Sequence, residues 1–410
     1  MNTLLLENIS VEATKFLSIR HNYNVVSLNH TLSENDLIQK INADNISIIG
    51  IRSKTKITTK VIQNCPSLLG VGCFCIGTDQ VDLEVAGDSG IVVFNSPFSS
   101  TRSVAELTLC QIIALSRKLC VKNEEMHRNY WNKTASGMHE VRGRTLGIIG
   151  YGHVGSQLSI LAENFGMNVI YYDIKNVMPL GNSSSCKTMN AVLQRADYVS
   201  LHVPLDETTR NLIGLKQLQL MKKGSYLLNL SRGAVVDIEA LSECIRNGHL
   251  AGASIDVFPS EPRGNQVEWN MGVSGLHNVI LTPHIGGATI EAQDSIGLDV
   301  VNKIHRFVIT GNTEDSVNLP HISVNGFSEN SVRICCIHQN KYGAMAKIND
   351  IYSKHGINII KQYLSTKGKI GYCVTEIQQP IDQNLKSIVY DIRKLDINIK
   401  TSVKYGKNVR

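Results

Sequence analysis

Short apolar runs alternate with segments of helical spacing along most of the chain. In residues 1–100, polar segments such as the helix-like stretch Leu32–Ile41 separate the apolar runs. The runs themselves are Val25–Leu28, Ile46–Ile51, Leu68–Val71 and Ile91–Phe94. This alternation is typical of an α/β unit with a parallel sheet.

A second alternating series follows a long apolar helix predicted over Val104–Leu119. Its strand-like runs are Thr145–Ile149, Asn168–Tyr172, Tyr198–Val203, Tyr226–Leu230, Gly252–Val257 and Val279–Leu281. The series predicts a doubly wound sheet over roughly residues 100–285. A further helix, Ala288–Ile309, is long enough to return the chain to the first domain.

The remainder of the chain has a different order of elements. Gly311–Asn330 is polar and has little pattern, which favours a linker. After it, the sequence predicts a strand, a helix, two strands, a helix and a strand. Their positions are Val332–Ile337, a helix around Met345–Tyr352, Ile357–Leu364, Gly371–Ile377, residues 382–394 and Ile397–Val403. The order βαββαβ is that of a ferredoxin-like domain.

The series of elements divides the chain into domains. We predict one domain from residues 1–100 plus 287–318, a nucleotide-binding domain over 101–286, a linker over 319–330 and a C-terminal domain over 331–410. A length of 410 residues agrees with two or three domains.

The segment Thr145–Asp173 carries a dinucleotide-binding pattern. An apolar strand is followed by Gly150, Gly152 and Gly155, then by a helix, a second strand and Asp173. The glycines permit a tight turn, close approach to a pyrophosphate and close packing of helix on strand. A glycine triplet alone also fits an ordinary tight turn, but the flanking strand, helix and acid favour a dinucleotide. An acid about 20 residues on accepts a hydrogen bond from a ribose hydroxyl and repels a 2′-phosphate, so we predict NAD, although Lys175 lies near.

Composition narrows the class of protein. No apolar run is long enough to span a bilayer, and no basic segment precedes an apolar one at the N-terminus, so we expect a cytoplasmic protein without membrane contact. Ten cysteines with no zinc-type spacing indicate free thiols and no metal site.

The net charge is +6, and residues 331–410 carry 14 Lys and Arg against 5 Asp and Glu. Because these charges are scattered among apolar residues, a solvated face fits better than nucleic-acid binding.

Three titratable or charged residues lie just past predicted strand ends. They are Arg232, Glu261 and His284. A histidine exchanges a proton near neutral pH, a carboxylate beside it raises its pKa, and an arginine holds a carboxylate through two hydrogen bonds. Each alone has a structural explanation, as a cap, a turn residue or a buried loop histidine. At three strand ends of one nucleotide-binding sheet, they indicate oxidation of a 2-hydroxy acid.

Several motifs around these residues are similar to one known family. Asn229–Asp237, Asp256–Pro262 and Leu281–Gly287 resemble the D-isomer-specific 2-hydroxyacid dehydrogenases, and further motifs support this: Gly72–Thr78, Phe98–Glu106 and Gly147–Gly155. Within the family, the resemblance is to the short bacterial type that acts on D-3-phosphoglycerate. The tail resembles an ACT domain, the module that binds serine in that type. The resemblance implies a flavodoxin-like substrate domain and a Rossmann-type NAD domain.

The resemblance also implies roles for individual residues. His284 would be the general acid/base, Glu261 its partner, and Arg232 the ligand of the substrate carboxylate. Residues lining the NAD site would be Gly150, Gly152, His153, Val154, Gly155, Asp173, Leu230, Ser231, Arg232, Asp256, His284, Ile285, Gly286 and Gly287. Substrate contacts would come from Arg52, Ser53, Lys54, Ser100 and Arg232, and from Lys133 of a neighbouring subunit in a homotetramer. Without the family, Arg52, Lys54 and Lys133 fit solvated surface cations equally well.

Three residues of the tail match the serine-contacting positions, and two stretches of the chain depart from the family. His338, Asn340 and Asn358 would bind L-serine as an effector. Ser100 stands where the family has Asn, and Lys341-Tyr342 stand where it has Arg-Pro. The first change affects one substrate or hinge hydrogen bond, and the second leaves the loop after the first strand of the tail less rigid.

The resemblance implies NAD-dependent oxidation of D-3-phosphoglycerate to 3-phosphohydroxypyruvate, the first step of L-serine biosynthesis, with feedback by L-serine. Three alternatives remain open at this point. One is a dehydrogenase of another D-2-hydroxy acid, which Arg52, Lys54 and the ACT-like tail disfavour. Another is a dinucleotide-sensing protein without catalysis, which an intact Arg232, Glu261 and His284 disfavours. The third is a scaffold or amino-acid sensor that functions through its tail alone.

Overall fold

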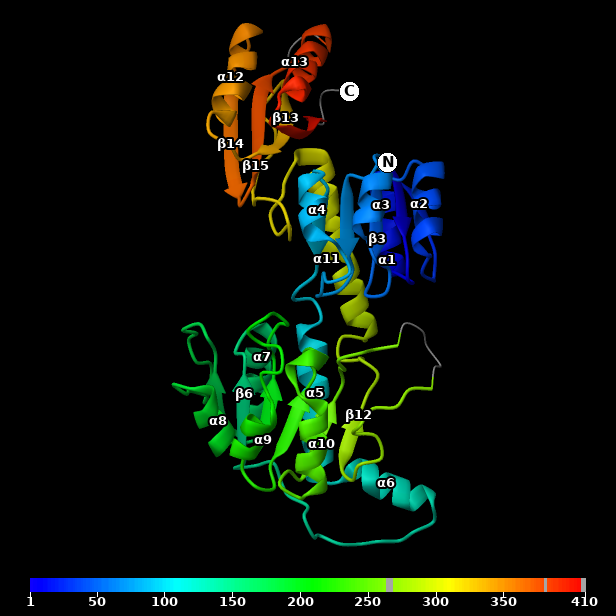
Figure 1. The fold of residues 1–410 in the computed structure, drawn as a ribbon, viewed down its shortest axis with the longest axis vertical. Helices are drawn as coiled ribbons and strands as arrows, with labels where there is room; N and C mark the ends of the chain where they lie inside the picture. The colour runs from blue at the N-terminus through cyan, green and yellow to red at the C-terminus, as the bar shows by residue number, and fades with distance from the viewer. Residues whose placement is uncertain (263–267, 380–381, 407–410) are drawn as a thin grey trace. The chain divides into compact units, whose positions relative to one another are not determined.

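The computed structural model describes residues 1–262, 268–379 and 382–406. The chain forms two compact units, one of Met1–Ser99 with Gln293–Arg410 and the other of Ser100–Ala292. Figure 1 labels their helices and strands.

The first unit contains a five-stranded sheet in the order β2-β1-β3-β4-β5, in which every neighbouring pair is parallel. The strands are β1 Asn2–Leu5, β2 Asn24–Ser27, β3 Ile48–Ile51, β4 Gly70–Cys73 and β5 Val92–Asn95. This order is the flavodoxin-like one, as the family resemblance implied. Strand β1, at the start of the chain, was not predicted.

Helices cover both faces of this sheet. Successive strand residues alternate between two buried clusters, with Leu5 in one and Leu4 and Leu6 in the other. The helices are α1 Val11–Lys15 with a π-helical turn Phe16–Arg20, α2 Glu34–Ala43, α3 Thr59–Asn64, α4 Leu83–Asp88 and α11 Ile290–Thr310. Side-chain caps fix several starts, as at Ser33, whose hydroxyl accepts from the Asp36 N–H.

The second unit is built on a seven-stranded parallel sheet in the order β12-β11-β10-β9-β6-β7-β8. The strands are β6 Thr145–Ile149, β7 Asn168–Tyr172, β8 Ser184–Ser185, β9 Tyr198–Leu201, β10 Tyr226–Asn229, β11 Gly252–Ile255 and β12 Val279–Leu281. The order reverses between β6 and β9, which is the point where an open α/β sheet binds its ligand. This is the predicted doubly wound, Rossmann-type sheet.

Two buried clusters cover the two faces of the seven-stranded sheet. One contains Ile112 of α5 and Leu158 of α7, and the other contains Leu193 of α8, Leu218 of α9 and Leu241 of α10. The helices are α5 Thr101–Ser116, α6 Leu119–His127, α7 His153–Asn164, α8 Met189–Arg195, α9 Leu215–Leu220 and α10 Ile238–Arg246.

The single helix predicted over Val104–Leu119 differs from the structure. Helix α5 ends at Ser116, and a separate helix α6 begins at Leu119. Lys118 between them has a left-handed conformation with φ of 50°, which breaks the helical path. Apolar spacing continues across this break, so the sequence pattern alone did not reveal it.

The tail folds as the predicted βαββαβ unit, a four-stranded antiparallel sheet in the order β14-β15-β13-β16. Its elements are β13 Ser331–Gln339, α12 Ala344–Lys354, β14 Ile359–Lys367, β15 Ile370–Gln378, α13 Asp382–Lys394 and β16 Asn398–Tyr405. The segment 311–330 before it has no helix or strand, yet Leu319, Ile322 and Val324 are buried. That segment therefore packs as part of the first unit.

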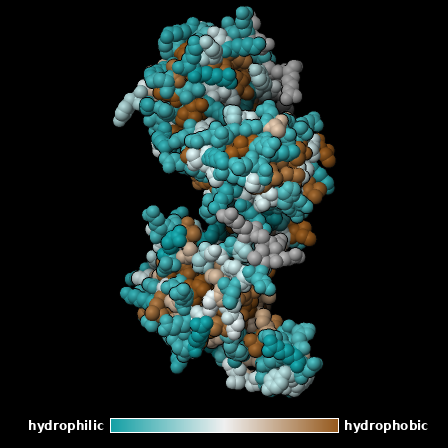
Figure 2. Space-filling view, turned by 45° about the vertical axis from the view of Figure 1, so that its right-hand side comes forward, coloured by the Kyte–Doolittle hydropathy of each residue, from teal (hydrophilic) through white to brown (hydrophobic). Residues whose placement is uncertain are grey.

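In the part of the chain that the structure describes, no helix is long and apolar enough to cross a membrane. Figure 2 shows hydrophobic residues as small patches between hydrophilic ones on the face that it draws.

Candidate active site

The glycine turn after β6 has a geometry that only glycine permits at two positions. Gly150 has a φ of 92°, and a Cβ there would lie 2.4 Å from the His202 carbonyl oxygen. A Cβ at Gly155 would lie 2.2 Å from the Gly150 carbonyl oxygen, so the helix packs directly on the turn. A Cβ at Gly152 would meet nothing within 4 Å, so the space above the start of α7 is open.

Asp173 lies at the end of β7 beside this turn. Its Oδ2 accepts from the Tyr151 N–H at 2.7 Å, and its Oδ1 accepts from the Lys175 N–H at 2.9 Å. Each carboxylate oxygen has a lone pair left for a ribose hydroxyl. Helix α7 begins at His153 and Val154, so its positive end faces the open space above Gly152. An open anion site beside an acid fits the pyrophosphate and adenosine ribose of NAD.

We expect Asp173 to select NAD over NADP. Replacement by Asn keeps one acceptor oxygen for the Tyr151 N–H but removes the charge that repels a 2′-phosphate. The ratio of kcat/KM for NAD to that for NADP should fall at least about tenfold in Asp173→Asn, which corresponds to about 1.4 kcal/mol. Initial rates with both cofactors measure this ratio. Equal kcat/KM values for NAD and NADP in the unmodified protein would show that Asp173 does not select NAD.

Arg232 follows β10 in a turn built by Asn229. The side-chain Oδ1 of Asn229 accepts from the Ser231 N–H and hydroxyl, and its Nδ2 donates to the Arg232 carbonyl oxygen at 3.0 Å. A Cβ at Gly233 would lie 1.9 Å from the Phe258 carbonyl carbon, which requires glycine there. The turn thereby fixes the half-buried Arg232 and the adjacent Leu230 and Ser231 at the ligand-binding edge of the sheet.

Asp256, at the end of β11, organises the loop that carries the histidine. Its fully buried carboxylate accepts from the Thr282 hydroxyl at 2.5 Å and from the Ile285 and Gly286 N–H groups, each at 2.9 Å. The backbone N–H of His284 donates to the Asp256 carbonyl oxygen at 2.8 Å. His284 itself has a φ of 55°, a strained conformation that these bonds hold. Asp256 thus fixes the direction of the His284 side chain.

His284 and Glu261 form the pair that the strand ends predicted. The Nδ1 of His284 lies 2.8 Å from Oε2 of Glu261. Because an ionised carboxylate only accepts, Nδ1 carries a proton, and Nε2 of the neutral ring is the atom able to take one. Both side chains remain partly exposed, at 47% and 36%.

The two charges adjust each other's protonation. The hydrogen bond to Glu261 raises the pKa of His284 above its ordinary value, against the opposing effects of burial and of Arg232. Burial alone would raise the pKa of Glu261, but the hydrogen bond and charge of His284 outweigh it and lower that pKa. Arg232 and Asp256 both act electrostatically on His284, so the structure brings these four residues together.

The remaining predicted substrate residues lie in separate places. Arg52, Ser53 and Lys54 follow β3 in the first unit, where Glu7 accepts from the Lys54 and Thr55 N–H groups at 3.0 and 2.7 Å. Ser100 belongs to the second unit, is 2% exposed, and packs against Gly287. Lys133 is exposed in the segment after α6. Each unit therefore presents its own part of the predicted site.

The predicted effector residues lie at the end of β13 and before β14. His338 is 1% exposed and packs on Gly371, and its Nδ1 is 2.9 Å from the Gln339 carbonyl oxygen. Asn340 and Asn358 are exposed, and the Asn340 amide donates to the Gly368 carbonyl oxygen at 3.1 Å. Within the described part of the chain, His338 Nε2 and Gln339 Oε1 are buried without a hydrogen-bond partner. Gln339 was not predicted, because its polarity alone does not distinguish it from a surface residue.

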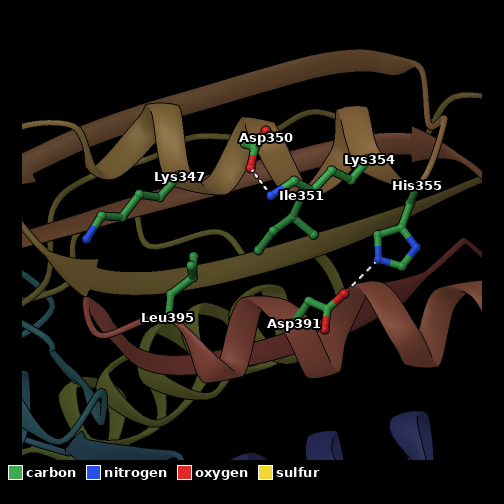
Figure 3. A pocket seen from close by; sticks show the side chains of 7 residues that line it. All are labelled: Lys347, Asp350, Ile351, Lys354, His355, Asp391 and Leu395. Carbon is green, nitrogen blue, oxygen red and sulfur yellow. Dashed lines mark hydrogen bonds and ion pairs between the residues drawn. The ribbon is translucent and has the colours of Figure 1, made fainter.

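A groove of about 260 Å³ lies between α12 and α13, away from these residues (Figure 3). It is lined by charged side chains that are already paired, including His355 with Asp391 and Lys354 with Asp350. It therefore offers no unsatisfied group to a ligand. Across the described residues, no cluster of three or more His, Cys, Asp or Glu could hold a metal ion.

Two family descriptions match the chain. Residues 109–286 match the D-isomer specific 2-hydroxyacid dehydrogenase, NAD binding domain, and residues 334–400 match the AHAS small subunit-like ACT domain. The first range contains the glycine turn and the His284 loop, and the second contains most of the antiparallel sheet.

Curated relatives cover nearly the whole chain. A D-3-phosphoglycerate dehydrogenase from Dictyostelium discoideum is 48% identical over 98% of this chain and 97% of its own. One from Escherichia coli strain K12 is 44% identical over 94% of this chain and 93% of its own.

Solved structures match about three quarters of the chain. The TT0316 protein from Thermus thermophilus is similar over 75% of this chain and 97% of its own, with a TM-score of 0.67 and 29% identity. A D-lactate dehydrogenase from Aquifex aeolicus, complexed with NAD and lactic acid, covers 75% of this chain and 95% of its own, with a TM-score of 0.65 and 25% identity.

Proposed function

Because the chain belongs to the D-isomer-specific 2-hydroxyacid dehydrogenases, and within them to the D-3-phosphoglycerate dehydrogenases, we propose that it oxidises D-3-phosphoglycerate to 3-phosphohydroxypyruvate with NAD. This reaction begins the biosynthesis of L-serine. The observation that carries the proposal is the His284–Glu261 pair, which Asp256 holds near Arg232 at the edge of a dinucleotide-binding sheet.

The proposed mechanism uses these residues in turn. Arg232 binds the substrate carboxylate through its guanidinium and places C2 at the edge of the sheet. Nε2 of His284 takes the proton from the C2 hydroxyl, and Glu261 stabilises the imidazolium that results. When bound, NAD supplies the acceptor for the hydride that leaves C2. Gly150, Gly152, Gly155 and Asp173 would hold its pyrophosphate and ribose.

The phosphate of the substrate needs further cations. We propose that Arg52 and Lys54 bind it, in a loop whose backbone Glu7 holds by two hydrogen bonds. Ser53 adds a hydroxyl donor, and Lys133 from a neighbouring subunit adds a third charge. Arg52 can make two parallel hydrogen bonds to a phosphate, whereas Lys54 acts as a point charge.

Turnover tests this proposal against its alternatives. NADH formation should be fast with D-3-phosphoglycerate and weak with D-lactate or D-glycerate, which lack the phosphate. Arg52→Ala should raise KM for D-3-phosphoglycerate while leaving the rate with D-lactate unchanged. Equal rates with all three acids would favour a different D-2-hydroxy acid, and NAD binding without any turnover would favour a sensing protein.

We further propose that L-serine inhibits the enzyme through the ACT domain, with His338, Asn340 and Asn358 as its contacts. The buried, unpartnered Nε2 of His338 and Oε1 of Gln339, within the described residues, support a polar ligand there. Tyr342 is fully exposed, so the loop before α12 gains little order from its packing. Ordering that loop around a ligand costs entropy.

Inhibition should therefore appear only at high concentrations of L-serine. Titration of L-serine against turnover, with glycine as control, measures it, and Asn340→Ala should abolish it. Allosteric coupling is typically about 1–3 kcal/mol, so a modest loss of loop order removes most of the effect. Half-inhibition at low micromolar serine would show that Lys341 and Tyr342 do not weaken the binding of L-serine. Absence of both inhibition and calorimetric binding would make the domain purely structural.

We propose a homotetramer in the cytoplasm. Leu119, Met126, Tyr130 and Trp131, in and after α6, are between 51% and 76% exposed, a concentration of apolar surface that a second copy would cover. The same segment carries Lys133 toward the neighbouring subunit. All ten cysteines are free thiols, which fits a reducing compartment. Sedimentation equilibrium measures the subunit number.

A further inference from the structure

Two lysines of strand β16, the half-buried Lys400 and the buried Lys404, lie where the four-stranded sheet meets the five-stranded domain of the same unit. Lys400 and Lys404 alternate with Ser402, so the three side chains lie on one face of the strand. Opposite them on β13 are Ile337, Cys335 and Arg333. This face packs against Leu69, Gly90 and Phe307 of the five-stranded domain.

Within the described residues, neither lysine has an acidic partner. The Nζ of Lys400 donates to the Leu68 carbonyl oxygen at 2.7 Å. Lys404 is only 8% exposed, and its Nζ lies 5.2 Å from the centre of the Phe307 ring. The contrast is Lys369 at the same junction, which pairs with both Glu84 and Asp88 at 2.9 Å. A buried ammonium without a counter-charge is costly, and a ring face offsets only part of that cost.

Both lysines line a common cavity. Its volume is about 60 Å³, and Ser402, Thr401, Tyr372 and Cys335 complete its polar lining. This volume is well above the roughly 10–15 Å³ that a cavity needs to hold one water, so there is room for a small polar guest. The Tyr372 hydroxyl already donates to the Gly311 carbonyl oxygen, so the free donors are those of the lysines and Ser402.

We propose that this cavity binds a phosphate-sized oxyanion between Lys400 and Lys404, with Ser402 as a third donor. The anion supplies the negative charge that the protein lacks there and ties the four-stranded sheet to the five-stranded domain. The chemistry is that of free inorganic phosphate or of a phosphate group on a small metabolite, and the size of the cavity favours the free ion. The site is separate from the active site and does not rest on the proposed reaction.

The protonation of the two lysines predicts a second measurable property of the site, the uptake of protons when the anion binds. Burial lowers the pKa of Lys400 to about 8 and lowers that of Lys404 as well. Cys335 and Tyr372 also face the cavity, and burial raises the pKa of each, so both stay neutral near pH 8. An anion beside the lysines raises their pKa values again. Binding at pH 8 must therefore take up protons from the buffer.

The test is calorimetric titration of the full-length protein with inorganic phosphate at pH 8, in two buffers with different heats of ionisation. We use the Arg52→Ala background, which removes the principal active-site contact proposed for phosphate. Lys404→Met and Lys400→Met keep the apolar stems but remove the charges, and each should weaken binding at least tenfold and abolish proton uptake. Lys369→Met is the matched control at the same junction and should leave both unchanged. Glycerol 3-phosphate tests the metabolite source against the free ion.

The outcomes separate cleanly. Binding with proton uptake that the two cavity variants lose and Lys369→Met keeps supports the site. Binding that is the same in all variants, or absent from the parent protein at 10 mM phosphate (roughly the millimolar affinity of a weak site), overturns it. Circular dichroism of each variant shows whether a loss of phosphate binding comes from misfolding. The milder Ser402→Ala variant should weaken phosphate binding severalfold without removing a charge.

Discussion

Replacement of His284 by alanine should lower kcat for D-3-phosphoglycerate oxidation by about 10²–10⁴-fold, the usual contribution of a positioned acid/base. The physical reason is that Nε2 of His284 is the atom free to take the C2 proton, while Nδ1 is committed to Glu261 at 2.8 Å. The binding of NAD should be unchanged, because the glycine turn and Asp173 do not depend on the imidazole. Steady-state rates and NAD titration measure the two effects. Turnover within a factor of about three of the parent would end the assignment.

The pH dependence distinguishes a chemical role for Glu261 from a structural one. Oxidation requires a neutral imidazole, so turnover should rise with pH through the pKa of His284. Glu261 holds that pKa above the ordinary histidine value of 6.5. In Glu261→Gln the pKa should fall, so the acid limb of the kcat/KM profile should move to lower pH while the plateau rate drops. A loss of rate with no movement of that limb would assign Glu261 a structural role only.

The elements of the fold that depend on local sequence were predicted well. The turn at Gly150, the helix after it and Asp173 at the end of β7 lie within 30 residues, and backbone conformation and sheet pairing determine their geometry. The pairing of Glu261 with His284 could also be predicted from the sequence, because the carboxyl ends of parallel strands share one edge of the sheet. In each case a general rule of α/β architecture connects sequence to position.

Features that depend on non-local hydrogen bonds were not predicted. Asp256 was predicted to line the NAD site, and its further role as the support of the His284 loop, through bonds to Thr282, Ile285 and Gly286, was not foreseen. No periodicity reveals which buried acid will meet which backbone N–H group. Lys118 is a local feature that was also missed, because its left-handed backbone separates α5 from α6.

The buried pair of Arg333 and Glu376 is a further feature that sequence reasoning missed. Both side chains are fully buried, and the Nε of Arg333 donates to Glu376 at 2.8 Å. The guanidinium also donates to the carbonyl oxygens of Asn325 and Gly326, each at 2.6 Å, and lies 4.1 Å from the Phe327 ring centre. It therefore fastens the segment before β13 to the sheet. In the sequence, an arginine in an apolar strand resembles an edge residue that faces solvent.

Arg333→Met should destabilise the four-stranded sheet by about 3–5 kcal/mol, the cost of leaving a buried charge without its partner. Because the chain has several domains, the proper measure is hydrogen exchange of the β13 and β15 amides, which reports the local opening free energy. Arg393→Met is the matched control, since Arg393 is exposed and makes one bond, to the Thr401 carbonyl oxygen at 3.2 Å. A loss below about 1 kcal/mol in Arg333→Met, equal to the control, would contradict the expectation.

The pair of Arg333 and Glu376 should also make the stability of the four-stranded sheet sensitive to acid. Burial alone would raise the pKa of Glu376, but hydrogen bonds from Ser328 and the charge of Arg333 lower it to about 2 from 4.5. A depressed pKa contributes stability that is present above pH 4.5 and is lost as the pH falls toward 2. In Arg333→Met/Glu376→Leu no charge is left unpaired, so the double variant should be more stable than Arg333→Met. Its sheet should also lose this part of its acid sensitivity. A double variant whose destabilisation equals the sum of the two single changes would show that the pair is not coupled, and the segment before β13 would then depend on Phe327 and the carbonyl contacts alone.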